Sequence, residues 1–121
     1  MSLREFAAAG PAESVRLIGF HSCEIVGNFP GGDILIVRGE APCLNMRIRL
    51  SPRIYIDCPE YWGIEVTGSL RGGICLTAIK PYVVSIPLAG IVGYKGIEVI
   101  GSRRSERMDV PGGCSPGSSR T

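Results

Sequence analysis

The sequence predicts an all-β fold, a small barrel or sandwich of roughly eight to nine short strands. Three observations carry this prediction. Short runs rich in β-formers recur at the spacing of about 8–12 residues that is typical of such folds. The 17 glycines and 9 prolines separate these runs without a Gly-X-Y period. Two runs alternate between apolar and polar residues, which indicates half-buried strands. With 121 residues, of which 45% are hydrophobic, the chain can bury one core.

The elements follow in order along one domain, residues 1–101. A short N-terminal helix is expected over residues 1–10, because Ser2 can cap a first turn with Glu5 three positions later. Strands are expected at Val15–Phe20, Cys23–Val26, Asp33–Arg38, Leu44–Leu50, Arg53–Asp57, Ile64–Leu70, Gly73–Ile79, Tyr82–Ile86 and Ile97–Ile100. Residues 102–121 lose this periodicity and are rich in Arg, Ser, Gly and Pro, which predicts a flexible C-terminal tail.

Two strands show which of their faces is buried. In Leu44–Leu50 the apolar side chains alternate with polar ones that include Arg47 and Arg49. The run Ile64–Leu70 alternates in the same way, with Glu65 on its polar face. If the two strands are neighbours, Arg47 or Arg49 is expected to face Glu65 across the sheet.

Two other runs are apolar on both faces. They are Ile34–Val37 and the pair Val83 and Val84. Such strands are either covered on both sides or exposed at a subunit contact. Because a chain of this length has few elements for covering both faces, we expect a homo-oligomer, with a twofold dimer favoured.

Charge and cysteine content narrow the classes of function. The net charge of +2 lies in the tail, since residues 1–101 hold nine cations and nine anions, which is not the footprint of a general nucleic-acid binder. Five cysteines without a C-x-x-C pair and a single histidine predict no metal or other cofactor. We expect buried free thiols in a reducing cytoplasm, and no membrane association.

One predicted loop gathers residues suited to binding. It runs from Asp57 to Trp62 and holds Glu60, Tyr61 and Trp62. Aromatic and charged side chains in a loop are typical of recognition sites. The same aromatic residues could instead close one end of a barrel.

A second candidate is an arginine-rich strand face. Arg47, Arg49 and Arg53 share this region with Tyr55, and cations beside an aromatic ring suit a groove for single-stranded nucleic acid. A charged outer face is also the ordinary way to keep a sheet soluble.

A third candidate is thiol chemistry. His21 and Cys23 lie two residues apart and would share a strand face, and Cys58 lies in the predicted loop. The alternative is a packed thiol beside a partly exposed imidazole. We therefore expect a non-catalytic protein that acts by self-association and by binding a protein or small ligand. The alternatives are a nucleic-acid-binding barrel and a cysteine-dependent enzyme.

Overall fold

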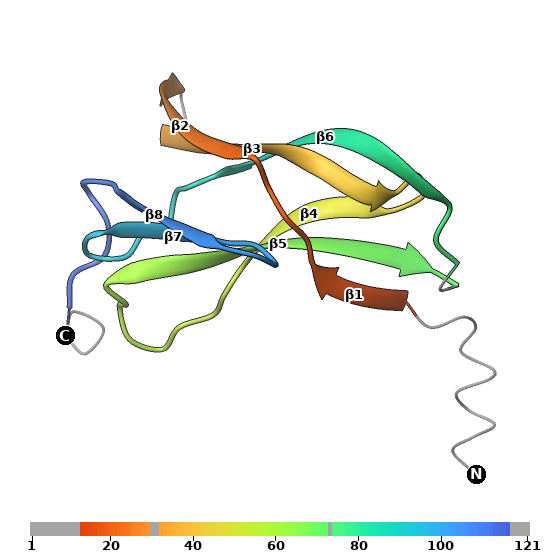
Figure 1. Cartoon of the computed structure of the whole chain (residues 1–121). Coiled ribbons are helices and arrows are strands. Elements are labelled where there is room, and N and C mark those ends of the chain that lie inside the picture. The colour runs from red at the N-terminus through yellow and green to blue at the C-terminus, as the bar shows by residue number, and fades with distance from the viewer. Residues whose placement is uncertain (1–12, 30–31, 73, 117–121) are drawn as a thin grey trace, which may run out of the picture.

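The computed structural model describes residues 13–29, 32–72 and 74–116, which fold into two layers of β-sheet (Figure 1). The larger sheet contains β1 (Glu13–Leu17), β4 (Arg47–Pro52), β5 (Tyr61–Arg71), β7 (Gly96–Ile100) and β8 (Ser105–Asp109). The smaller sheet contains β2 (Ser22–Phe29), β3 (Gly32–Cys43) and β6 (Thr77–Pro87). The all-β prediction is confirmed. The two sheets do not close into a barrel.

Strand β5 organises the larger sheet. It pairs with β4 along one edge, while the other edge pairs with β7 at its start and with β1 at its end. The β5–β7 pairing is parallel, and β8 then pairs antiparallel with β7. In the smaller sheet β3 is central, with antiparallel neighbours β2 and β6. Strand β5 therefore links every element of its layer except β8.

The core lies between the two sheets. Alternate residues of β3, β5 and β7 point into it and are fully buried: Leu35, Val37, Ile64, Val66, Ile97 and Val99. In β4 the arginines are exposed while Ile48 and Leu50 pack against this core. The predicted alternation is therefore confirmed from Met46 to Leu50, whereas Leu44 is exposed in the turn before β4. In β5 the apolar face is buried as predicted, but Thr67 and Ser69 of the polar face are buried too, because β5 has strands on both edges.

Two strand predictions need correction. Arg53–Asp57 is a loop, because β4 ends at Pro52 and the backbone after Arg53 leaves the sheet. The runs predicted at 73–79 and 82–86 form the single strand β6, which begins at Thr77. The helix predicted over residues 1–10 lies outside the described residues.

The prediction of a flexible tail is wrong for residues 102–116. Strand β8 hydrogen bonds along β7, and Val110 behind it is only 5% exposed. Cys114 is bonded to Cys58 in a disulfide. A partner strand and a covalent bond order a segment whose own hydrophobic pattern is weak.

The prediction of free thiols is wrong for four of the five cysteines. Cys43 is bonded to Cys75 and Cys58 to Cys114, with Cα–Cα distances of 5.2 and 5.8 Å. Their sequence separations of 32 and 56 residues gave no sign of either pairing. Cys23 is the remaining free thiol.

Two side chains hold their protons more tightly in the folded chain than in water. The Tyr82 hydroxyl donates to the Gly19 carbonyl oxygen at 2.6 Å, and burial raises the pKa of Tyr82 to about 12. Burial, followed by the neighbouring carboxylate of Glu106, raises the pKa of Cys23 to about 12. Both groups remain protonated in the folded chain at a pH where they would ionise in the unfolded chain.

Stability is therefore expected to fall as the pH rises above the ordinary pKa values of 9.0 for Cys23 and 10.0 for Tyr82. In that window the folded chain binds more protons than the unfolded chain, so raising the pH favours unfolding. Guanidinium titrations from about pH 8 to about pH 11 measure this slope. In the Cys23→Ala and Tyr82→Phe variants, the free energy of unfolding should fall less steeply with pH than in the wild type. A fall as steep as that of the wild type in both variants would show that these two groups do not cause it.

Candidate binding loop

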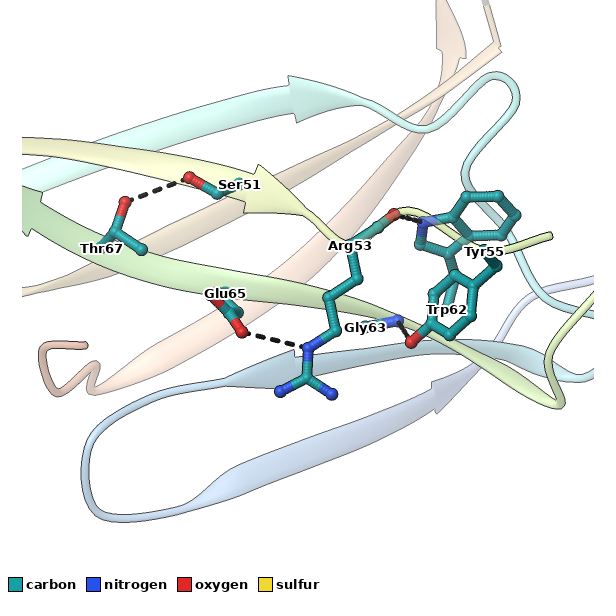
Figure 2. Close-up of polar contacts among 7 residues, drawn as sticks. All are labelled: Ser51, Arg53, Tyr55, Trp62, Gly63, Glu65 and Thr67. Atoms are coloured by element: carbon teal, nitrogen blue, oxygen red, sulfur yellow. Dashed lines mark hydrogen bonds and ion pairs between the residues drawn. The ribbon is translucent and has the colours of Figure 1, made fainter. Parts of the chain in front are cut away.

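The loop over residues 53–60, which joins β4 to β5, is folded back onto the beginning of β5 (Figure 2). The Trp62 indole Nε1 donates to the Arg53 carbonyl oxygen at 2.9 Å. The backbone N–H of Gly63 donates to the Tyr55 hydroxyl at 3.0 Å. The Tyr55 and Trp62 rings meet edge to face with centroids 5.0 Å apart. These contacts fix the first half of the loop.

An ion pair reinforces the same end of the loop. Arg53 Nε lies 3.0 Å from Glu65 Oε2, and this hydrogen bond raises the pKa of Arg53 (Figure 2). The predicted contact of Glu65 with Arg47 or Arg49 is wrong. The register places Ser51 opposite Glu65, so Arg53 is the arginine that reaches it.

The second half of the loop is tied to the segment before β7. The backbone N–H of Tyr94 donates to the Pro59 carbonyl at 2.9 Å, and that of Lys95 donates to the Glu60 carbonyl at 2.8 Å. Lys95 Nζ also lies 2.7 Å from Glu60 Oε2, which lowers the pKa of Glu60 and raises that of Lys95. With the disulfide of Cys58, both ends of the loop are held.

The outward side of this anchored loop is apolar. Alternate residues of an extended segment point in opposite directions, so with Tyr55 turned toward β5 its two neighbours point away. Ile54 is 94% exposed and Ile56 is 92% exposed, more than any other large hydrophobic side chain in the described part of the chain. Each forgoes about 1.5–3 kcal/mol that burial of such a side chain yields. Together they form the apolar tip of the loop.

The aromatic residues predicted to bind make contacts within the protein. Tyr55 and Trp62 hold the loop, and the Tyr61 hydroxyl donates to Asp109 Oδ1 at 2.7 Å, which raises the pKa of Tyr61. The Arg107 guanidinium lies 4.7 Å from the centre of the Tyr61 ring. Sequence reasoning missed Ile54 and Ile56, although the alternation between Pro52 and Pro59 was the available signal.

The structure divides the residues of the predicted nucleic-acid face. Arg53 and Tyr55 are engaged in the loop, as described above. Arg47 and Arg49 are exposed on the outer face of the larger sheet, with no carboxylate partner among the described side chains. Arg47 lines a small polar hollow of about 170 Å³ with Asn45, Ser69 and Arg71.

The residues considered for thiol chemistry are placed with different partners. His21 Nε2 lies 3.8 Å from Glu40 Oε1. Burial, followed by the charge of the Glu106 carboxylate, raises the pKa of the Cys23 thiol and keeps it protonated at neutral pH, whereas a nucleophilic cysteine needs the thiolate. Cys58 is oxidised in its disulfide. This arrangement activates none of the three for nucleophilic attack.

Comparison of the chain with protein-family models, with curated proteins and with solved structures finds no match. Among the residues that the structure describes, no three or more His, Cys, Asp or Glu side chains gather as metal ligands. The same residues include no helix with the length and apolar character needed to cross a membrane.

Proposed function

We propose that this is a non-catalytic binding protein that inserts Ile54 and Ile56 into an apolar cleft of a partner protein. The observation that supports the proposal is the near-complete exposure of both side chains, at 94% and 92%, on a loop held at both ends. Large apolar side chains that fill a pocket dominate the energy of many protein interfaces. A loop that is already fixed loses little conformational entropy when it binds.

The surroundings of the tip favour a protein cleft over other partners. Arg53 is paired with Glu65, and Lys95 with Glu60, so neither cation is free for lipid or nucleic-acid phosphates. Anionic membranes attract clusters of unpaired Lys and Arg. Small ligands bind in concave sites, whereas this tip points outward.

The disulfides favour a compartment other than the predicted cytoplasm. Disulfides persist in oxidising environments and are rare in the cytosol, where thiols are kept reduced. One of the two bridges, Cys58–Cys114, ties the loop itself to the C-terminal segment. We therefore place the function of the loop in an oxidising compartment.

Photo-crosslinking tests the proposal. A photoreactive amino acid at position 54, introduced in cells that make the protein, should capture a discrete protein adduct. The purified partner should then bind the Ile56→Asp variant at least about 30-fold more weakly than the wild type, as expected for a central contact. The Ile74→Asp variant is the matched control, because Ile74 is also exposed but lies in the connection to β6. Equal losses in both variants, or adducts with lipid alone, would contradict the proposal.

Single-stranded nucleic acid is a second candidate partner, supported by the exposed and unpaired Arg47 and Arg49. With Tyr55 engaged by Gly63, this face lacks the stacking ring that was predicted for it. Fluorescence anisotropy with a short single-stranded DNA or RNA at low salt tests the idea. The double Arg47→Ala, Arg49→Ala variant should reduce the salt slope by about 1.4, because each phosphate contact contributes about 0.7. Absence of binding at low salt would remove this candidate.

A further inference from the structure

The outer face of the smaller sheet is apolar. Alternate residues of its three strands point away from the core, and six of these are apolar: Val26, Ile34, Ile36, Pro81, Val83 and Pro87. We call them the outer apolar face. The strand register places Ile34 between Val26 and Pro87, and Val83 is 63% exposed. In Figure 1 no described segment lies over β2, β3 and β6 on this side. The predicted two-sided apolar strands are therefore uncovered on one side.

The free edge of β6 is unsuited to pairing with another strand. The Leu88 N–H donates to the Asp33 carbonyl, so even-numbered residues of β6 turn their backbone groups toward β3 and odd-numbered ones turn away. Two of the outward positions, Pro81 and Pro87, have no N–H to donate. Prolines on an edge strand oppose edge-to-edge association. Strand β2, the other edge, has a bulge after Val26. Association is therefore expected through the face and not through an edge.

An ion pair lies within this face. Glu24 and Arg38 form an ion pair with an Nη1–Oε2 distance of 2.7 Å. Both lie on the outer side of the sheet, so two opposite charges cancel beside the apolar residues. Glu40 is a third charge on this side, opposite Pro81, and it lies 3.8 Å from the His21 imidazole at one end of the face. The apolar residues around Ile36 therefore lie beside charges that are already paired, so an identical face can cover them.

The area of the outer apolar face indicates how tightly two copies would associate. At about 3.3 Å per residue, the 11 residues of β6 span about 36 Å, and three strands are about 15 Å wide. The two faces of a dimer would thus bury about 1,000 Å² together, near the lower limit for a specific interface. Such an interface predicts weak, micromolar association.

We infer that a second copy of this chain packs on the outer apolar face about a twofold axis, forming a homodimer of micromolar affinity. A twofold axis applies the same patch to itself and closes the assembly at two copies. This inference is independent of the apolar tip, which lies on the β4–β5 loop.

Sedimentation velocity on the full chain tests the inference. Between about 1 µM and about 1 mM, the mass should move from 12.9 kDa toward twice that value. Val83→Lys should raise the dissociation constant at least about 10-fold by burying a like charge beside Arg38. Val15→Lys is the matched control, because Val15 is 62% exposed but lies on the larger sheet, so this variant should associate as the wild type does.

Three outcomes would overturn the inference: a mass of 12.9 kDa at every concentration, equal weakening by Val83→Lys and Val15→Lys, or loss of the dimer in Ile56→Asp. The last would place the interface at the loop. Circular dichroism of each variant confirms that a loss of association is not a loss of fold. An intact dimer with no partner captured at position 54 would instead contradict only the proposed function.

Discussion

Truncation after Gly101 is expected to unfold the protein at physiological temperature. The deletion removes β8, leaves β7 without its antiparallel neighbour, and takes away the buried Val110 and the Cys58–Cys114 bond. The disulfide alone contributes about 4 kcal/mol for a separation of 56 residues. Burial of one valine adds about 1.5–3 kcal/mol. Their sum is comparable with the total stability of about 5–15 kcal/mol that a domain has.

Far-ultraviolet circular dichroism during heating measures this effect. The full-length double variant Cys58→Ala, Cys114→Ala is the control, because it removes the covalent bond and keeps β8. It should lose about 4 kcal/mol and still show a cooperative transition. A truncated chain that melts at the temperature of the wild type would contradict the role of β8.

The double variant Cys43→Ala, Cys75→Ala is expected to lose about 3–4 kcal/mol, because the bridge restricts the unfolded chain over a separation of 32 residues. In the folded chain the bridge joins the end of β3 to the segment before β6. The Leu44 N–H also donates to the Leu76 carbonyl at 2.8 Å, which keeps the segment in place but does not restrict the unfolded chain. Guanidinium titration of the oxidised proteins measures the loss.

Cys23→Ala is the control for that variant, since Cys23 is free and half-buried. Its loss should be clearly smaller than that of the double variant. A similar loss in both would show that the sulfur packing, and not the covalent bond, carries the effect. Maleimide labelling of the denatured, unreduced wild type should modify one cysteine, and labelling after reduction should modify all five.

Local patterns in the sequence were sufficient to predict the all-β class and the buried faces of β4 and β5. Side chains alternate between the two faces of a strand, so consecutive residues alone place Arg47 and Arg49 on the solvent face, without knowledge of the neighbouring strands. The pairing of Glu65 could not be placed in this way. It depends on the register between two strands, and that register brings Arg53 to it.

Strand β8 and the disulfides depend on contacts distant in sequence. In Ser105–Asp109 the inward positions are Glu106 and Met108, so a single apolar side chain marks the buried face. The backbone pairing with β7 holds this segment as a strand, although its hydrophobic pattern alone does not predict one. Cysteine pairing is likewise a property of the folded chain, because spacing alone does not define connectivity.

The loop shows how one pattern fits two structures. Alternation at Ile54, Tyr55 and Ile56 predicts a strand, and the side chains do alternate in direction. Hydrogen bonds from Trp62 and Gly63, however, hold the segment against β5 outside any sheet ladder. The same alternation thus turns the tyrosine into an anchor and exposes the isoleucines, which is the basis of the proposed binding site.

Solvent paramagnetic relaxation of the isoleucine methyl groups tests that site most directly. With a soluble nitroxide probe, the δ1 methyl groups of Ile54 and Ile56 should relax fastest, and those of the fully buried Ile64 and Ile97 slowest. The Trp62 indole N–H should exchange slowly, because it is hydrogen bonded to the Arg53 carbonyl. Methyl groups of Ile54 and Ile56 that are protected as well as those of Ile64 would contradict the account.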